Sequence, residues 1–347
     1  MMERKCYLSN LIGIVLVLII SLVFISTGSA AETKPADVPK VIRWVSASLG
    51  SSGYNAITNL SAMVGRYDKK SRHSTMATAG SVENCRLIPA GEADLGQTIS
   101  SDIINRLKAQ NQFKNEKPAE IWQIMGYRQN VDIFYTKETS PIKTVEDFNG
   151  KSFGLGPAGG SVALRDLAVL KVLGGKYKIR YGTWKSMHEQ LSIDKIDVIA
   201  PATVGGAIPT PATGELAATY PLHIIPLSKD LIEKAAKLIP GGSVGTVKPE
   251  LLKLFKNGQG LETYGTATFA ILGVRPNLSE QAVYNITKAI FEHEDQIRKR
   301  VQDLRYVSKA NTFKLMLKDV PVHPGAARYY KEIGIWDNDF KVGVLPK

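Results

Sequence analysis

The sequence predicts an α/β protein of two lobes, each a sheet flanked by helices, and three observations lead to that prediction. The chain has 347 residues, whereas single hydrophobic cores stop growing at roughly 250 residues. Strand-like segments alternate with helix-like segments, which is typical of parallel sheets with crossover helices. Two further strand-like segments have no helix signal beside them, and we expect them to connect the lobes.

The alternation begins near the N-terminus and recurs twice. In each case a β-rich segment is followed by a break rich in glycine and small residues, and then by residues with helical spacing. The predicted strand and helix pairs are 41–48 with 54–64, 76–81 with 82–90, and 151–156 with 162–174. We expect further strands at 95–100, 176–183 and 197–203.

The strand-like segments 131–135 and 266–274 are the expected crossings between the lobes. They would divide the chain into a first lobe of residues 40–132 plus 270–347 and a second lobe of residues 133–268. Apolar residues at helical spacing predict one amphipathic helix over 279–303, which would close the first lobe.

Composition excludes several classes of protein. A chain with 44% hydrophobic and 22% charged residues is neither collagen-like, disordered nor a polytopic membrane protein. Its two cysteines, Cys6 and Cys85, cannot build a disulfide framework or a closed four-cysteine zinc site. We expect Cys85 to be a small buried hydrophobic residue.

The first thirty residues are typical of an export signal. Arg4 and Lys5 precede the uncharged run 11–25, and Ala30 and Ala31 follow it, in the order of a cleaved signal peptide. The run is shorter than the ~20 residues of a spanning helix. We expect residues 1–30 to be removed and the mature chain to be periplasmic.

The formal net charge of +12 indicates an anionic partner. The basic residues are scattered and no basic run is interleaved with aromatic residues, so we do not expect nucleic-acid binding. Small anions or an acidic membrane surface fit the charge, and so does solubility alone.

Three of the predicted helices begin directly after glycine or serine. The amides of a first helical turn have no partner within the helix and carry partial positive charge, which favours an anion. If the three starts meet between the lobes, they form a site for a carboxylate. The alternative is that these glycines only permit tight turns.

Six segments together resemble the TAXI family, the solute-binding subunits of tripartite (TRAP) transporters. The similarity extends over about residues 40–335, and the segments, in order, are GSSGY 50–54, GSVEN 80–84, GEADL 91–95, GPAGGS 156–161, DKID 194–197 and HPGAARYY 323–330.

This resemblance implies a two-lobed periplasmic binding protein of the type II-like fold, a monomer that closes about its hinge strands. It implies a receptor rather than an enzyme, and no cofactor. The ligand would be a small organic anion or amino acid, glutamate-like or a dicarboxylate. The receptor would deliver it to the TRAP membrane subunits, a permease driven by an ion gradient.

The same resemblance gives the expected ligand-binding residues. They come from the glycine-serine loops and from the strands beside them, and are Ser51, Ser52, Tyr54, Gly80, Ser81, Gly159, Gly160, Ser161 and Thr203. Ser100 is expected there too, although the family commonly has glutamine and Gln97 is displaced in this chain.

Two larger side chains are further candidates. Trp184 stands where the family has smaller residues, and it either lines the pocket, which would favour a bulkier ligand, or packs in the core. Arg128 either pairs with a ligand carboxylate, whose geometry a guanidinium matches, or forms a surface salt bridge.

Other function classes are also open to the sequence. Residues 154–159 match G-x-G-x-x-G of nucleotide-binding oxidoreductases, but the next strand lacks the acid for a ribose. Residues 241–245 match the G-x-S-x-G elbow of hydrolases, but lack a strand before and a helix after the serine. A binding protein that reports to a signalling receptor rather than to a permease is a further alternative.

Overall fold

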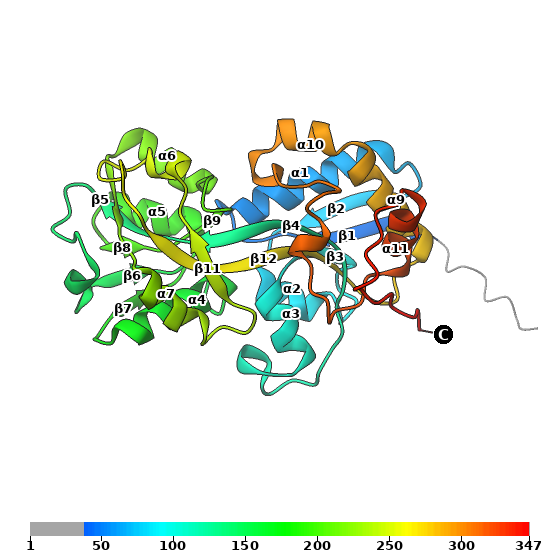
Figure 1. Ribbon diagram of the computed structural model, residues 1–347, viewed down its shortest axis with the longest axis horizontal. Helices are drawn as coiled ribbons and strands as arrows, with labels where there is room; N and C mark the ends of the chain where they lie inside the picture. Colours follow the sequence, from blue (N-terminus) through cyan, green and yellow to red (C-terminus); the bar gives the residue numbers. More distant parts are fainter. Residues whose placement is uncertain (1–37, 347) are drawn as a thin grey trace, which may run out of the picture. The chain divides into compact units, whose positions relative to one another are not determined.

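The protein is described here by a computed structural model covering residues 38–346, so the predicted signal peptide at residues 1–30 lies outside the described residues. Within them, the expected α/β class is confirmed, because helices flank two separate sheets of seven and five strands (Figure 1). The two sheets are the frame on which the site residues are placed.

The seven-stranded sheet has the order β2-β1-β3-β12-β4-β9, and β11 pairs with β12. Pairing of β1 with β2 and β3 is parallel, as the alternation of strands and helices predicts. The strands are β1 (Val41–Val45), β2 (Arg72–Met76), β3 (Leu95–Ile99), β4 (Trp122–Asp132), β9 (Ala202–Val204), β11 (Ser243–Thr246) and β12 (Tyr264–Val274).

Helices cover both faces of this sheet. One face packs against α1 (Ser52–Tyr67), α9 (Glu280–Glu292) and α11 (Pro324–Glu332). The other face packs against α2 (Ser81–Leu87) and α3 (Ser100–Leu107), and Cys85 is fully buried there as expected. The remaining elements of this part are α10 (Glu294–Arg300) and the 3-10 turns η1 (Asn111–Phe113), η3 (Gln302–Leu304) and η4 (Phe313–Leu315).

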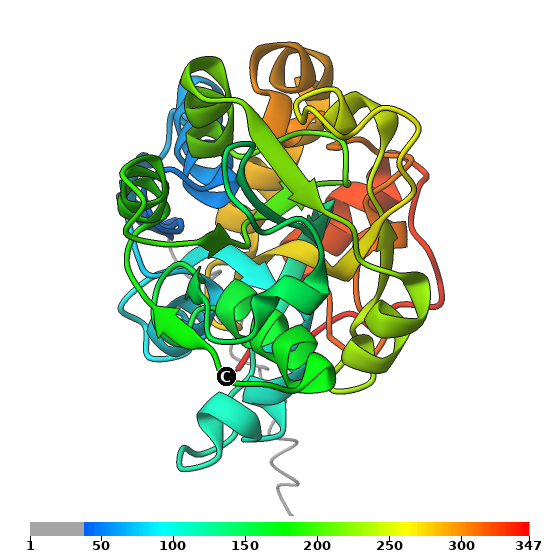
Figure 2. The same cartoon turned by 90° about the vertical axis from the view of Figure 1, so that its left-hand side faces the viewer.

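The five-stranded sheet has the order β10-β5-β8-β6-β7. Figure 2, turned so that this part faces the viewer, shows its helices on either side of the strands. Its strands are β5 (Phe134–Lys137), β6 (Ser152–Gly154), β7 (Lys178–Arg180), β8 (Val198–Ile199) and β10 (Leu222–Ile225). One face packs against α4 (Ser161–Leu173), α7 (Lys229–Ala236) and the 3-10 turn η2 (Val145–Phe148). The other face packs against α5 (Trp184–Ser192), α6 (Pro211–Thr219) and α8 (Pro249–Leu252).

The first helix shows how local sequence sets these elements. The hydroxyl of Ser51 accepts a hydrogen bond from the amide of Tyr54 at 3.1 Å, which caps the start of α1. Ala56, Ile57 and Leu60 recur at helical spacing and are fully buried. The cap and the apolar stripe together place the glycine-serine loop at the end of β1.

The predicted strands 131–135 and 197–203 are each wrong as single strands. β4 ends at Asp132 and β5 begins at Phe134, in different sheets, and likewise β8 and β9 belong to different sheets. The two transitions lie side by side, because the amide of Ile133 donates to the carbonyl of Pro201 at 3.2 Å. A continuous apolar run does not reveal where a chain changes sheets.

Residues 133–268, the expected second lobe, also supply β9, β11 and the start of β12 to the seven-stranded sheet. The sheets therefore exchange strands more than once, and the division into two lobes stays a prediction.

The single helix expected over 279–303 is also wrong. The chain leaves the helical conformation at His293, with φ −119° and ψ 19°, and α10 then begins. The ring of His293 stacks on Tyr67 there. Within residues 38–346 no helix has both the length and the apolar character that crossing a membrane requires.

Candidate functional site

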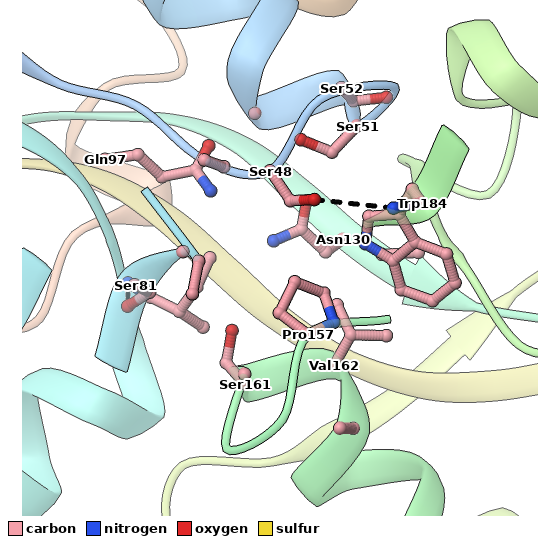
Figure 3. A pocket seen from close by; sticks show the side chains of 18 of the residues that line it. Ser48, Ser51, Ser52, Ser81, Gln97, Asn130, Pro157, Ser161, Val162 and Trp184 are labelled. Carbon is pink, nitrogen blue, oxygen red and sulfur yellow. Dashed lines mark hydrogen bonds between the residues drawn. The ribbon is translucent and has the colours of Figure 1, made fainter. Parts of the chain in front are cut away.

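A pocket lies between the two sheets, where loops from both of them meet (Figure 3). It is lined by the loop between β1 and α1, the starts of α2, α4 and α5, and residues of β3 and β4. The enclosed space is about 50 Å³, and one ordered water needs roughly 10–15 Å³. The pocket therefore suits a small ligand.

The three loops of glycine and serine, which precede α1, α2 and α4, come together at this pocket, as the hypothesis of one shared site requires. Of the expected site residues, those that line it are Ser51, Ser52, Gly80, Ser81, Arg128, Gly160, Ser161 and Trp184. The first residues of α2 and α4 follow Gly80 and Gly160, and neither glycine can supply a side-chain cap. Their first-turn amides are thus left for other partners.

Four expected residues do not line the pocket. The amide of Tyr54 is bound by the Ser51 cap. The hydroxyl of Ser100 accepts from the amide of Phe269, and the hydroxyl of Thr203 donates to the carbonyl of Val131. Gly159 adopts φ +69° in the turn before α4, with no atom near where a Cβ would lie.

Direct contacts close one side of the pocket. The carbonyls of Leu49 and Gly50 accept from the amides of Lys185 and Ala212 at 3.3 and 3.4 Å. The amide of Trp184 donates to the hydroxyl of Ser48 at 3.4 Å, drawn as the dashed line in Figure 3. The start of α1 and the starts of α5 and α6 therefore touch across the gap between the sheets.

Gly50 is required for this contact. It adopts φ +83°, and a Cβ there would lie 2.9 Å from the backbone nitrogen of Lys185. Both the backbone conformation and the close approach exclude other residues without strain. The indole of Trp184 is buried against Gly156 and also lines the pocket.

Arg128 is a buried cation without a carboxylate partner among the described residues. The guanidinium donates to the side-chain oxygen of Asn130 at 3.1 Å, to the carbonyl of Ser52 at 3.0 Å and to the side-chain oxygen of Gln97 at 3.2 Å. Its side chain is only 3% exposed. The alternative of a surface salt bridge is therefore wrong.

Arg165 is a second buried arginine at the pocket, and the sequence analysis missed it. Its Nε and Nη2 donate to the two carboxylate oxygens of Asp132 at 2.6 and 2.7 Å. Its Nη1 has no partner among the described residues. A signal was present, since Arg165 and Asp166 interrupt an apolar helical stretch whose other residues predict burial.

Gln97 and Asn130 also line the pocket without having been expected there. Gln97 fits because Gly53 has no side chain, and a Cβ at that position would collide with the Gln97 amide. Asn130 lies two residues beyond Arg128 on β4, so the two side chains point to the same face of the strand. Neither position was marked by a local motif.

The acidic side chains nearest the pocket, among the described residues, lie behind the residues that line it. No aspartate or glutamate is among the described residues that line the pocket. Burial raises the pKa of Asp102 to about 6, against the opposing effects of the Ser81 hydroxyl and the Arg165 charge. Burial and the neighbouring Asp132 raise the pKa of Asp166 well above its usual value.

The segments that match the G-x-G-x-x-G and G-x-S-x-G motifs lie in different structural surroundings. Gly154 ends β6 and the loop to Gly159 precedes α4, so the G-x-G-x-x-G loop forms part of the pocket wall. Ser243 begins β11, which continues to Thr246 with no helix directly after it, so the nucleophile elbow is absent at this serine. Within residues 38–346 no group of three or more histidine, cysteine or acidic side chains is placed to hold a metal ion.

Comparison with known proteins gives one family match. The model of the NMT1-like family matches residues 45–334.

Solved structures with a similar fold are distant in sequence. MatC from Rhodopseudomonas palustris with bound malate is 12% identical, with a TM-score of 0.51, and the match covers 76% of this chain and 88% of that one. The ligand-binding component of an ABC-type import system from Staphylococcus aureus with zinc bound is 13% identical, with a TM-score of 0.48, over 88% and 98% of the chains. The likeness to MatC supports the expected periplasmic binding protein fold.

Proposed function

The chain belongs to the NMT1-like family, and from that premise we propose that it is an extracytoplasmic solute-binding protein for a small organic anion. The ligand would occupy the pocket between the two sheets. The observation that carries the proposal is Arg128, a buried guanidinium that has no carboxylate partner among the described residues.

The electrostatic argument starts from the energy of burying a charge. Removing an ion from water costs several kcal/mol even after the protein relaxes. Arg165 recovers part of that energy from Asp132, whereas Arg128 binds only neutral oxygens. An anion in the pocket would supply the missing counter-charge, so binding would be strongly favoured there.

Backbone amides add to the attraction. The starts of α1 and α4 line the same pocket, and their first-turn amides carry the partial positive charge of the helix dipole. Each helix start contributes about 0.3–1 kcal/mol when exposed and up to ~2 when partly buried. The hydroxyls of Ser51 and Ser161 lie at these starts (Figure 3).

The finer function rests on the resemblance to the TAXI family. We propose that the two sheets belong to lobes that close about β4 and β12, and that the closed monomer delivers its ligand to the TRAP membrane subunits. A dicarboxylate suits a pocket with two arginines, and the malate in the MatC structure is a dicarboxylate. A signal peptide at residues 1–30 would place the protein in the periplasm.

The decisive experiment identifies the ligand. The protein is purified from its native export pathway, denatured, and the released small molecules are analysed by mass spectrometry. A thermal-shift panel of dicarboxylates, other carboxylic acids and amino acids then ranks the candidates. A ligand at a hundredfold excess over its dissociation constant stabilises the fold by about 2.7 kcal/mol.

Closure is tested with the ligand so found. Small-angle scattering should record a smaller radius of gyration at saturation, because closing the lobes compacts the molecule. A panel in which no anion raises the melting temperature would contradict the proposal of an anion receptor.

A further inference from the structure

Two side-chain amides of the pocket face the same guanidinium. Arg128 lies between Gln97 and Asn130, and both amide oxygens accept hydrogen bonds from it, at 3.2 Å from Nη2 and at 3.1 Å from Nε. The hydroxyl of Tyr127 also donates to the Gln97 oxygen, at 2.9 Å. Three donors therefore hold the oxygen ends of two amides.

This arrangement fixes which way each amide points. A guanidinium has only donors, so an amide beside it must present its oxygen and turn its nitrogen away. The amide nitrogens of Gln97 and Asn130 have no hydrogen-bond partner among the described residues. Figure 3 shows both nitrogens turned toward the middle of the pocket, so each supplies donors to a ligand.

The other polar side chains of the pocket can donate as well. The hydroxyl oxygens of Ser48 and Ser51 already accept from the amides of Trp184 and Tyr54, which leaves their protons free to donate. Arg165 contributes Nη1, which is buried and has no partner among the described residues. Among the residues that the structure describes, no carboxylate lines the pocket to receive a cation.

We infer that Arg128 is a positioning residue that turns Gln97 and Asn130 so that the pocket selects oxyanions without an ammonium group. The preferred ligands are then carboxylic acids that lack an α-amino group, and the matching amino acids are rejected. The inference rests on the proposed anion-binding function and narrows its ligand class.

The pocket would reject amino acids because of the positive charge on their ammonium group. An ammonium group brought into the pocket would lose its water and meet two guanidinium groups and amide donors. Like charges at close range and unpaired buried donors both weaken binding. We expect each amino acid to bind at least about tenfold more weakly than the acid of the same carbon skeleton, which corresponds to ~1.4 kcal/mol.

The test uses matched pairs on the wild-type protein. Titration calorimetry compares succinate with L-aspartate, glutarate with L-glutamate, and propionate with L-alanine. Tighter binding of the acid in every pair that binds supports the inference. An amino acid that binds as tightly as its acid overturns the inference and leaves the receptor function intact, whereas no binding or stabilisation by any anion overturns both.

Two isosteric variants test the roles of the amides directly. Gln97→Glu and Asn130→Asp keep an oxygen for Arg128 to donate to, but replace the free nitrogen with a carboxylate oxygen. In each variant the affinity for the acid should fall by about a hundredfold or more, and the ratio of acid to amino acid affinity should fall with it. A purely structural role would lower both affinities together.

Asn285→Asp is the matched control. Asn285 lies on α9, away from the pocket, and its side-chain oxygen accepts from Gln281, which the aspartate preserves. The control makes the same charge change and should leave both affinities unchanged. Folded Gln97→Glu and Asn130→Asp proteins with the wild-type affinity ratio would overturn the assignment, and the wild-type titrations decide it if either variant does not fold.

Discussion

Two arginines among the described residues that line the pocket differ in what balances their charge. Arg165, on α4, is held by both oxygens of Asp132, whereas Arg128, on β4, contacts amide and carbonyl oxygens alone. Both are almost completely buried. In the proposed receptor, the paired arginine would stabilise the frame of the site and the unpaired arginine would attract the ligand.

The comparison shows that burial alone does not identify a binding residue. What distinguishes Arg128 from Arg165 is the charge of its partners, because a neutral oxygen satisfies a hydrogen bond without cancelling the charge. A structural arginine should therefore matter for stability, and a ligand-binding arginine for affinity. The following variants separate the two effects.

The largest effect is expected from Asp132→Asn. It leaves Arg165 as an unpaired buried charge, which should destabilise the fold by ~3–5 kcal/mol in urea denaturation. Thr266→Val is the matched control, since the Thr266 hydroxyl donates to the same carboxylate at 2.9 Å. Losing that single hydrogen bond should cost about 1 kcal/mol, and equal losses in the two variants would contradict the role given to the ion pair.

In contrast to Asp132→Asn, the variant Arg128→Met should change the affinity for the ligand much more than the stability of the fold. Removing an uncompensated buried charge offsets the three lost hydrogen bonds, so stability should change by about 1 kcal/mol or less. The affinity for the anion found in the ligand screen should fall by ~2–5 kcal/mol, or at least about 30-fold. A variant that binds normally but unfolds readily would make Arg128 the structural arginine of the two.

Asp102→Asn probes the acidic group behind Arg165. The buried carboxyl has a pKa of about 6, raised from 3.8, so the folded state holds its proton more tightly than the unfolded state. Wild-type stability from this group is then full below pH 3.8 and is lost as pH rises through 6. At pH 7.5 the variant should be more stable by up to ~3 kcal/mol, and the difference should disappear below pH ~4.

Denaturation profiles from pH 3.5 to 7.5 measure this effect. Asp230→Asn, an exposed substitution on α7, is the control for loss of one charge and should leave the profile unchanged. A constant difference between Asp102→Asn and the wild type at every pH would mean that the pKa of Asp102 is the same in the folded and unfolded states.

Gly50→Ala tests whether ligand binding requires the direct contact between the loop before α1 and the start of α5, which closes one side of the pocket. The added Cβ would meet the backbone of Lys185, so the contact across the pocket should open and ligand affinity should fall by about tenfold. Gly174→Ala is the control, because Gly174 has a similar φ of +70° but no atom near its Cβ position. Both variants should lose about 1–2 kcal/mol of stability from backbone strain, and only Gly50→Ala should lose affinity.

Much of the fold and part of the site could be predicted from the sequence. The α/β class, the helix after each glycine-serine loop and the burial of Cys85 depend on short segments, whose periodicity and turn residues act locally. Ser51 and Gly80 follow strands of the same parallel arrangement, which brings the loops at its strand ends together. Ser161 follows a strand of the other sheet, so its place at the pocket depends on how the two sheets pack.

The remaining site residues belong to no local motif, although the charged Arg165 interrupts an apolar helical stretch. Gln97 was set aside because it stands outside the family motif, yet it reaches the pocket through the space left by Gly53. Arg165 meets Asp132 across 33 positions of the chain. The change of sheet at Ile133 was hidden for the same reason, since pairing partners, and not the run of apolar residues, decide where a strand belongs.

The sequence by itself determined the α/β class and the starts of α1, α2 and α4 after loops of glycine and serine, because caps, turns and hydrophobic periodicity involve residues a few positions apart. Only the tertiary structure decided which arginine is neutralised and which is not. A counter-charge is a matter of distance in space, and apart from the oxygen of Asn130, the oxygens that contact Arg128 and Arg165 come from residues 31 to 76 positions away along the chain.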